Sequence, residues 1–584
     1  MSARWRLILR YLPPYRRAVV LGLLALVVGD AGLVAIPPLL REGVRAVELA
    51  DRHGMPVDLG WVASYAAAAF VVALVSGVCQ FGKRNLLMGT SRDVETDLRR
   101  DLFAHIQRLP LRFFDRTRTG DLMSRATADL EAARMAVGPA AMYLLDSLLT
   151  FAGALTVMLA TNALLTLYAL GPLAGVCAGL LLFAPRIHKA SREVQDRMAA
   201  VSARAQESFA GGRVVKTFAT EDHEQAAMEQ LSHDYIAANL RLARIRGLTV
   251  AWIGLMGAAG LGVVLFVGGR QVMAGTFDIS GLLLFNMLQV MLVWPMMAFG
   301  WVLSLVQRGA AGLDRIAEVM DEAPEASVPE AAVPLAGELS FDDVRFAYNG
   351  AEILKGVSVR VPAGTTLGIL GPTGSGKSTL VALLARLYDP PPGTVRIDGR
   401  PVESLPLDGL RAAVAFVPQE AFLFSATIRE NIAFGRPDGA PDVLAEVVRD
   451  AHLAPDLEDF PRGLDTRVGE RGVTLSGGQK QRAALARALA ADAPVLVLDD
   501  ALSAVDSRTE TIILENLKRV RRGRTVLIVA HRVSAVRDAD RIVYLRDGRI
   551  EEEGTHAELI ARGGAYARLA RMQALEAEIE ELGA

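Results

Sequence analysis

Cysteine and net charge are both scarce in this chain of 584 residues. The two cysteines, Cys79 and Cys177, lie in apolar runs, so no disulfide framework is indicated. The formal net charge is −2, which leaves no overall basic field and argues against nucleic acid as a partner. No small-residue cleavage site follows the first apolar run, so this run is interpreted as a retained membrane span and not as a signal peptide.

Lysine is also rare, because nearly all of the 63 basic residues are Arg. This bias is typical of a GC-rich genome or of adaptation to heat, and the sequence is compatible with either. The bias makes one lysine informative. Lys377 lies in a glycine-rich stretch, where a compact ammonium group can reach phosphate oxygens.

Long apolar runs, in contrast, are plentiful. Hydrophobic residues make up 52% of the chain, and the mean hydropathy is +0.30. One or two runs of about 20 residues would also suit buried core helices, but a longer series favours a bundle of membrane helices. Six spans are predicted, at residues 18–40, 61–81, 139–160, 164–185, 248–272 and 279–306.

Arg and Lys predict the orientation of these spans, because cytoplasmic loops carry an excess of both. The long segments 83–137 and 186–246 are rich in Arg, whereas the links at 51–58, 161–163 and 274–278 are short and poor in cations. We therefore expect a multi-pass membrane protein, with both termini and both long segments in the cytoplasm. Each long segment is expected to be helical, to extend beyond the membrane and to turn sharply at its far end.

Two acidic residues, Asp30 and Asp146, lie inside the predicted spans, with Gln80, Asn286 and Gln289 as milder polar cases. Charged side chains are costly inside a membrane and usually face a cavity or a partner. Two interpretations stay open. Either the two acids line a polar translocation cavity, or they form hydrogen bonds between helices or lie at the membrane interface.

The composition changes after residue 320, which predicts the domain organisation. Residues 1–320 are predicted to be a transmembrane domain with two intracellular loops. Residues 321–338 are rich in Pro, Ala and Glu without an apolar period, and are predicted to form a linker. Residues 339–584 are typical of a soluble α/β domain. The predicted fold class is therefore an α-helical membrane bundle of six helices with long cytoplasmic extensions, followed by an α/β P-loop domain.

Residues 371–378 fit the pattern G-x-x-x-x-G-K-[ST], between an apolar strand at 366–370 and a helical run at 379–387. Glycines allow backbone N–H groups to surround phosphates, and the helix N-terminus adds partial positive charge. We expect Lys377 to contact the β- and γ-phosphates of ATP and Ser378 to bind Mg²⁺. The predicted ATP contacts in this stretch are Gly371, Thr373, Gly374, Ser375, Gly376, Lys377, Ser378 and Thr379.

A second apolar run, at 495–498, ends in the two acids Asp499 and Asp500. An uninterrupted run of this kind suits a strand that is buried on both faces of a parallel sheet. Asp499, at the end of the strand, is expected to bind Mg²⁺ directly or through water.

Residues 475–479, Leu-Ser-Gly-Gly-Gln, match the signature motif of ATP-binding cassette (ABC) proteins. The chain resembles the exporters of this family over essentially its full length. The resemblance implies that Tyr348 stacks on adenine, and that Gln419 senses Mg²⁺ and faces the coupling helices. It also implies that His531 contacts the γ-phosphate. Four signature residues are implied to complete the ATP site of a second chain: Ser476, Gly477, Gly478 and Gln479.

Further stretches are similar to exporter motifs. Residues 466–472 resemble the loop before the signature, and residues 503–506 resemble the D-loop. Residues 109–115 and 207–218 resemble the turns that carry coupling helices, although the aromatic residues there, Phe113, Phe114 and Phe218, would also suit packing within the loops. The family architecture requires two such chains, because each ATP lies between the P-loop of one chain and the signature of the other.

Asp500 departs from the family pattern, in which a Glu usually polarises the attacking water. Asp is one methylene shorter, so its carboxylate is drawn back by roughly 1 Å, and a misplacement on that scale can cost about 10²-fold in rate. A missing Glu beside an intact signature is typical of the degenerate-site half of a heterodimeric bacterial multidrug exporter. The catalytic candidates of this slow site are Asp500, His531 and Gln419, with Ser378, Gln419 and Asp499 around Mg²⁺.

The predicted function is ATP-driven export of small amphiphilic or hydrophobic substrates by a chain with coupled ATPase activity. The predicted partners are a homologous half-transporter, membrane lipids and a small-molecule or peptide substrate, without nucleic acid. A homodimeric lipid flippase and an ATP-gated membrane protein that does not transport are the alternatives. The predicted spans exclude a soluble ABC ATPase, and an importer is disfavoured because importers usually carry the two domains on separate chains. The substrate itself does not follow from the sequence.

Overall fold

The computed structural model describes residues 3–53, 56, 58–328, 334–436, 441–469, 475–520 and 523–583. The chain divides into two compact units. The helical unit contains Met1–Gln107 and Arg118–Ala323, and the α/β unit contains Arg108–Thr117 and Pro324–Ala584. Ten residues from the middle of the first long polar segment thus belong to the α/β unit.

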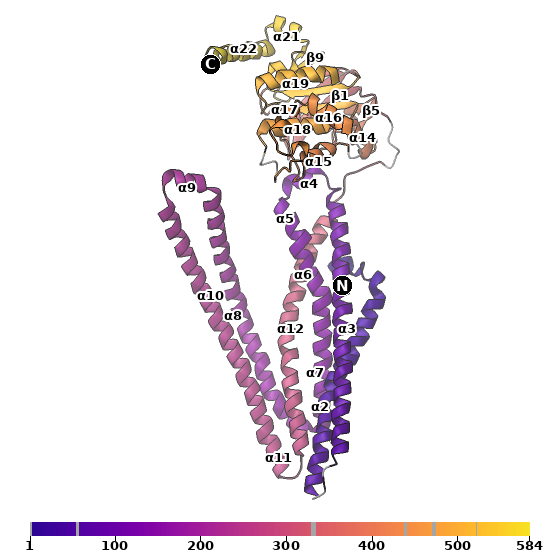
Figure 1. Cartoon of the computed structure of the whole chain (residues 1–584), viewed down its shortest axis with the longest axis vertical. Coiled ribbons are helices and arrows are strands. Elements are labelled where there is room, and N and C mark those ends of the chain that lie inside the picture. The colour runs from indigo at the N-terminus through magenta and orange to yellow at the C-terminus, as the bar shows by residue number, and fades with distance from the viewer. Residues whose placement is uncertain are drawn as a thin grey trace. The chain divides into compact units, whose positions relative to one another are not determined.

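Within the described residues, the helical unit has six helical segments that are long and apolar enough to cross a membrane (Figure 1). They are Pro13–Asp51, Leu59–Ile106, Thr119–Thr161, Ala163–Ala210, Glu221–Met273 and Ile279–Met320. This confirms the predicted six-helix bundle. Each segment is longer than the predicted span, because the Arg-rich stretches continue the same helices.

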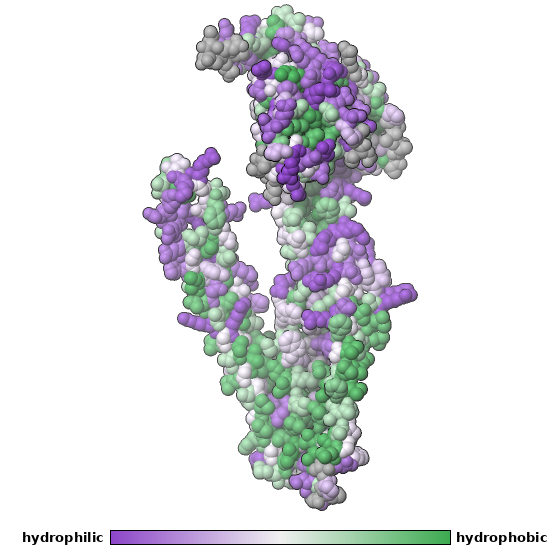
Figure 2. Space-filling view, in the orientation of Figure 1, coloured by the Kyte–Doolittle hydropathy of each residue, from purple (hydrophilic) through white to green (hydrophobic). Residues whose placement is uncertain are grey.

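The helices of this unit follow one another with short connections. They are α1 (Ala3–Leu9), α2 (Arg16–Arg52), α3 (Leu59–Ile106), α5 (Thr119–Ser124), α6 (Leu130–Met135), α7 (Ala141–Thr161), α8 (Ala163–Ala210), α9 (Gly212–Phe218), α10 (Glu221–Val263), α11 (Gly269–Met273) and α12 (Ile279–Met320). Apolar residues gather over the half of the unit that contains α11, and hydrophilic residues are more frequent toward α9 (Figure 2).

Apolar packing and local capping both explain these helices. Leu284, Phe285 and Leu288 of α12 are almost fully buried in one cluster with Ala154 of α7. Asn162 ends α7 and begins α8, where its side chain accepts a hydrogen bond from the backbone N–H of Leu165 at 3.0 Å, a typical N-cap contact. The short helix α9 joins α8 to α10, which lie side by side (Figure 1).

Three charged side chains meet between α2, α3 and α7. Lys83 Nζ lies 3.1 Å from Asp30 Oδ1 and also pairs with Asp146, and Gln80 donates a hydrogen bond to Asp30 at 3.0 Å. Asp30 is 1% exposed and Lys83 is 5% exposed. Of the two interpretations of these acids, bonding between helices is the one that the structure shows. Lys83, counted with the polar cytoplasmic segment by its charge, is instead buried within the continuous helix α3.

The α/β unit contains two sheets. The strands are β1 (Leu339–Tyr348), β2 (Ala351–Val361), β3 (Thr366–Leu370), β4 (Val395–Ile397), β5 (Arg400–Pro401), β6 (Val414–Val417), β7 (Val495–Asp499), β8 (Thr525–Ala530), β9 (Arg541–Arg546) and β10 (Arg549–Gly554). One sheet has the order β2-β1-β4-β5 and is antiparallel. The other has the order β10-β9-β3-β8-β7-β6, and its strands are parallel except for the edge strand β10.

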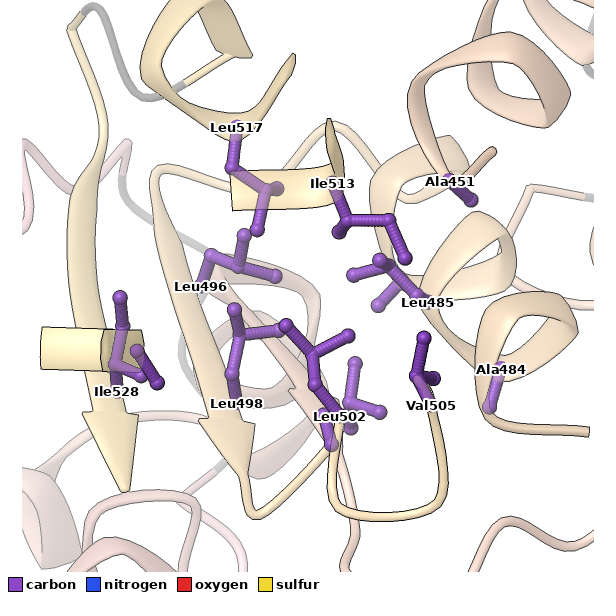
Figure 3. Packing of buried hydrophobic residues seen from close by; sticks show 14 of the residues in the cluster. Ala451, Ala484, Leu485, Leu496, Leu498, Leu502, Val505, Ile513, Leu517 and Ile528 are labelled. Atoms are coloured by element: carbon purple, nitrogen blue, oxygen red, sulfur yellow. The ribbon is translucent and has the colours of Figure 1, made fainter. Parts of the chain in front are cut away.

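Helices cover the parallel sheet. The helices of this unit are α4 (Leu111–Arg116), α13 (Lys377–Leu384), α14 (Leu407–Ala413), α15 (Ile428–Ala433), α16 (Pro441–Asp450), α17 (Ala454–Glu458), α18 (Gly477–Ala490), α19 (Ser507–Val520), α20 (Val533–Val536), α21 (His556–Arg562) and α22 (Ala565–Gly583). Leu496 and Leu498 of β7 face Ile513 and Leu517 of α19 and Leu485 of α18 in one buried cluster (Figure 3). This packing requires an apolar strand immediately before the two acids.

The helices and strands predicted for this unit are present, but some of them end at other residues than predicted. The helix after the glycine-rich loop begins at Lys377 and ends at Leu384, three residues before the predicted end. Arg386 has a positive φ of 47°, a left-handed backbone that does not continue an α-helix. Part of the predicted linker, residues 329–333, lies outside the described residues. Its end is fixed by Asp398, whose carboxylate accepts hydrogen bonds from three successive backbone N–H groups at residues 336–338.

Candidate functional site

A glycine-rich loop joins the end of β3 to the start of α13. Gly371, Gly374 and Gly376 have positive φ angles of 153°, 80° and 99°, a region that side chains disfavour. A Cβ atom on Gly371 would lie 2.1 Å from the carbonyl oxygen of Leu545, and one on Gly376 would lie 2.6 Å from Leu354. Two of the three glycines are therefore required by close packing as well as by backbone conformation.

The polar side chains of the loop are held at its base. Lys377 donates hydrogen bonds to the carbonyl oxygens of Gly371 and Pro372, both at 2.9 Å. Burial lowers the pKa of Lys377, and the charges of Asp500 and Asp499 oppose this shift. The Oγ atom of Ser375 is buried without a hydrogen-bond partner among the described residues.

Asp499 lies at the carboxyl end of β7, beside this loop. Its Oδ1 atom accepts a hydrogen bond from Ser378 Oγ at 2.9 Å. Burial raises the pKa of Asp499, whereas the hydrogen bond from Ser378 lowers it. The structure thus brings the Ser378 hydroxyl and the Asp499 carboxylate together, as the motif spacing predicts.

Asp500 follows on a strained stretch of backbone. Its φ is 48°, in the left-handed region that Asp tolerates better than most residues. Its N–H donates to the carbonyl oxygen of Val529 at 2.9 Å, and its own carbonyl accepts from Ser503 Oγ at 2.9 Å. His531 follows the neighbouring strand β8 and shares with Asp500 the wall of a cavity of about 80 Å³. The two catalytic candidates therefore lie at one edge of the sheet.

Helix α22 holds the segment around His531 in place by hydrogen bonds. Gln573 of α22 donates from Nε2 to the His531 carbonyl and accepts from the Val533 N–H, both at 2.8 Å. Sequence reasoning missed Gln573, and no local motif marks it. Its role depends on a contact between residues about forty positions apart.

Glu510 of α19 holds the same segment from another helix. It accepts hydrogen bonds from Arg532 Nη1 at 2.8 Å and from Ser534 Oγ at 3.1 Å. Glu510 is 3% exposed, and a buried carboxylate needs such partners. Sequence reasoning missed this residue as well, although its position four residues after Asp506 of the D-loop-like stretch was an available signal.

Tyr348 ends β1, and its ring contacts two other aromatic rings. The Tyr348 centroid lies 4.9 Å from that of Phe346 and 5.1 Å from that of Tyr388, both in edge-to-face geometry. The Tyr388 hydroxyl donates to Asp115 Oδ2 of α4 at 2.8 Å. Burial raises the pKa of Tyr388, and the hydrogen bond to Asp115 raises it further. The contact between Tyr388 and Asp115 was not predicted, because 273 positions separate the two residues in the sequence.

The signature residues form the start of α18. Ser476 is the N-cap, and it exchanges backbone and side-chain hydrogen bonds with Gln479 in a capping box. A Cβ atom on Gly478 would lie 3.1 Å from the carbonyl oxygen of Ala504. The signature therefore packs against the D-loop-like stretch, whereas Ser476 itself is exposed. Residues 470–472 of the preceding exporter-like loop lie outside the described residues.

The remaining predicted residues differ in exposure. Gln419 follows β6 and is exposed. Among the aromatic residues of the two predicted turns, Phe113 of α4 is 6% exposed, Phe114 is 39% exposed and Phe218 of α9 is 73% exposed. Phe113 is therefore buried and belongs to the α/β unit, whereas Phe218 is largely exposed. Thr373 and Thr379 lie in the glycine-rich loop and in the first turn of α13.

Comparison with known proteins decides the family. Residues 19–296 match the model of the ABC transporter transmembrane region, and residues 354–503 match the ABC transporter model. The chain belongs to the ABC transporter family. The multidrug resistance-like ATP-binding protein MdlA of Escherichia coli is 36% identical over 96% of this chain and 95% of its own length.

Other relatives of this ABC transporter extend the similarity over nearly the whole chain. An ATP-dependent lipid A-core flippase of Chromohalobacter salexigens is 34% identical and covers 98% of both chains. A solved structure of a bacterial Atm1-family ABC exporter with ATP bound is 30% identical, with a TM-score of 0.78 over 96% of this chain and 98% of that chain. The chain is therefore a multi-pass membrane protein and an ATP-driven ABC exporter.

Proposed function

We propose that this ABC exporter exports small amphiphilic or hydrophobic molecules as one half of a heterodimer, and that it carries the slower of two ATP sites. The observation that carries this proposal is the short carboxylate of Asp500 on a restrained backbone. The arrangement is similar to that implied for multidrug exporters of the TmrAB kind. Residues 1–320 would form the transport pathway, 321–338 the linker and 339–584 the nucleotide-binding domain.

Asp500 has little freedom to compensate for its shorter side chain. Its N–H is bonded to Val529 and its carbonyl to Ser503, so a backbone shift toward a nucleotide would break one of these hydrogen bonds. A reach shortened by roughly 1 Å is expected to slow hydrolysis by about 10²-fold at this site. His531 is present, and Gln573 holds its backbone by a hydrogen bond at 2.8 Å, so residual hydrolysis here is compatible with the proposal.

The glycine-rich loop fits ATP with Mg²⁺. Backbone N–H groups of the loop and the first turn of α13 would bind phosphate oxygens, with Lys377 supplying a positive charge. Ser378 and Asp499 would hold Mg²⁺ together with phosphate and water oxygens, and Gln419 would approach from β6. Among the described residues there is no group of three or more His, Cys, Asp or Glu that could hold a metal. Mg²⁺ is usually held by one or two carboxylates together with phosphates and water.

The signature supports the proposal of a second chain. Ser476 is exposed at the N-terminus of α18, where its hydroxyl and the adjacent N–H groups can meet the γ-phosphate of an ATP bound to a partner. This chain would thereby complete the faster site of its partner, which we propose to carry Glu at the position of Asp500. The proposed location is the bacterial inner membrane, with the nucleotide-binding domain and both termini in the cytoplasm.

A homodimeric lipid flippase is the second candidate, since a lipid A-core flippase is 34% identical over nearly the full chain. Purification of the chain from its native membrane separates the two. We expect a second, homologous half-transporter to copurify in equal amount, as measured by mass spectrometry. Analytical ultracentrifugation that shows a stable, transport-active dimer of this chain alone would contradict the heterodimer. A chain that hydrolyses ATP without vectorial uptake into liposomes would favour an ATP-gated protein.

A further inference from the structure

The buried charged group between α2, α3 and α7 contains more acid than base. Asp30 and Asp146 both approach the same atom, Lys83 Nζ, which lies 3.1 Å from Asp30 Oδ1 and also pairs with Asp146. Two carboxylates and one ammonium group have a net charge of −1 when all three are ionised. The side chains of Lys83 and Asp30 are 6% and 1% exposed, so this charge lies in the interior of the bundle.

Neighbouring helices do not supply a second cation. Among the described residues, Lys83 is the only cation that pairs with either acid. Helix α12 also packs against α2 and α7, but its first charged residue is Arg308, and Asp146 is the only charged residue of α7. The other charged or titratable side chains near the cluster along these helices are the exposed Arg84 and the thiol of Cys79 on α3, and Tyr143 on α7.

One carboxylate oxygen of the cluster lacks a partner. Gln80 and Lys83 both donate hydrogen bonds to Asp30 Oδ1, at 3.0 and 3.1 Å. The other oxygen, Asp30 Oδ2, is buried without a hydrogen-bond partner among the described residues. A buried acceptor without a donor is costly. A protonated carboxyl group can supply that donor, because it carries an O–H group.

Close packing between α2 and α3 favours a very small ligand. A Cβ atom on Gly29 would lie 3.2 Å from Cys79 Cβ, and one on Gly32 would lie 3.2 Å from Ser76 Cβ. Ser76 Oγ also donates a hydrogen bond to the Gly29 carbonyl oxygen at 2.6 Å. Among the described residues there is no group of three or more His, Cys, Asp or Glu that could hold a metal ion. The smallest ligand that neutralises a carboxylate is a proton.

We propose that Asp30 and Asp146 together bind one proton beside Lys83, and that this proton makes the cluster electrically neutral. Two carboxyl groups that share one site do not both ionise readily, because their charges repel each other. An uncompensated charge inside an apolar membrane bundle is also costly. Proton binding is linked to the packing of the bundle, since separation of α7 from α2 and α3 would return both carboxyl groups to water. The site is independent of the proposed heterodimer and of the ATP sites.

Infrared spectroscopy of the purified complex at neutral pH detects the proton directly. A protonated carboxyl group has its own C=O band, which shifts in heavy water. We expect Asp30→Asn and Asp146→Asn each to remove one such band, because either change leaves a single carboxylate paired with Lys83. Asp222→Asn makes the same chemical change at an exposed position in the first turn of α10, and it should leave the bands of protonated carboxyl groups unchanged.

The pH dependence of stability provides a second measurement. At neutral pH the folded complex would hold one proton more than the unfolded chain, in which both aspartates are ionised. Stability therefore falls as the pH rises, and this site contributes a factor of about ten per pH unit to the ratio of folded to unfolded protein for as long as the proton stays bound. We expect the melting temperature of the unmodified complex to fall more steeply with pH than that of Asp146→Asn. Asp222→Asn should follow the unmodified complex.

Identical carboxyl bands in the unmodified complex and in both Asn variants would overturn the proposal, because a metal cation or a cation of the partner chain would then neutralise the cluster. Parallel pH dependence of the melting temperatures of the unmodified complex and Asp146→Asn would also overturn it. Retained elution volume shows whether each variant has folded. If one Asn variant has not folded, the other decides the question, because the proposed site requires both carboxyl groups.

Discussion

Asp500 is limited in its reach by its backbone as well as by its side-chain length. The left-handed φ of 48° and the hydrogen bonds to Val529 and Ser503 place the Cα atom, and the side chain then falls one methylene short of a Glu. Small movements of the loop therefore cannot easily bring the Asp500 carboxylate to the position that a Glu carboxylate would reach. For the proposed heterodimer this position implies asymmetry, because this chain would supply one weakened ATP site and one intact signature.

Tyr348 and Tyr388 allow ATP affinity and coupling to be separated. Tyr348→Ala should weaken ATP binding by about 1–3 kcal/mol, if base stacking here resembles that on single strands, and Tyr348→Phe should have little effect. Tyr388→Phe keeps the ring contact with Tyr348 but removes the hydrogen bond to Asp115 of α4. We expect it to leave ATP affinity within about twofold and to lower transport per ATP hydrolysed. Nucleotide titration and vesicle uptake measure the two quantities; equal loss of affinity in Tyr348→Phe and Tyr348→Ala would point to the hydroxyl instead.

At the scale of single residues, the sequence predicted the motif residues better than the distant residues that hold those motifs in place. Ser378 and Asp499 meet as expected, because the P-loop pattern and an apolar strand before an acid are local signals. Gln573, which fastens the segment after β8, has no such signal. Its partners lie far away in the sequence, and only the folded packing of α22 reveals the contact.

At the scale of helices, the buried group of Asp30, Lys83 and Asp146 joins three helices of the bundle. Removing the cation leaves two carboxylates without their partner, and breaking a buried pair costs about 3–5 kcal/mol. We therefore expect Lys83→Met to lower the thermal stability of the detergent-solubilised complex strongly. Lys189→Met, at an exposed position of α8, should change stability by less than about 0.5 kcal/mol.

A triple substitution tests whether the charge imbalance causes the loss of stability. Lys83→Met combined with Asp30→Asn and Asp146→Asn leaves no unpaired carboxylate and should recover most of the lost melting temperature, because neutral polar groups cost less to bury than charges. If Lys83→Met melts at the same temperature as Lys189→Met, the ion pairs contribute nothing measurable to the bundle.

The short helix α9 presents an exposed aromatic side chain, Phe218, at the turn between α8 and α10. Such a residue suits docking onto a nucleotide-binding domain better than packing within its own loop. Phe218→Ala is therefore expected to lower transport more than it lowers ATP affinity. Phe103→Ala, an exposed aromatic position on α3, is the control and should leave both nearly unchanged. Loss of nucleotide binding with unchanged transport per ATP would show that Phe218 only supports folding.

Prediction at the scale of helices and strands depended on how strong the local pattern was. The six apolar helices and the strands at 366–370 and 495–499 followed from long or uninterrupted apolar runs. Lys83 counts with the cytoplasmic segment when only its charge is considered, since charge alone does not reveal a buried partner. The resemblance to exporters placed both turns, and the structure then separated the buried Phe113 from the exposed Phe218.

At the scale of the whole molecule, we propose an exporter chain whose two contributions to ATP hydrolysis are unequal. Its P-loop, Asp499 and Asp500 would form the slow site, and its signature would complete the fast site of the partner. We therefore expect ATP turnover to tolerate substitution of Asp500 and to be sensitive to substitution of Ser476. The position of Asp500 in the acid pair beside the nucleotide would by itself suggest the opposite, namely that Asp500 is the more sensitive position.

Steady-state ATP hydrolysis by the purified complex, measured for Asp500→Asn and for Ser476→Arg, tests whether the two ATP sites are unequal. Ser476→Arg places a bulky cation at the signature N-cap and should lower turnover by about 10²-fold, because the γ-phosphate contact of the fast site is lost. Asp500→Asn should change turnover by less than about twofold, because the site it alters already contributes little. If Asp500→Asn is as damaging as Ser476→Arg, Asp500 is a working catalytic base and the asymmetric account is wrong.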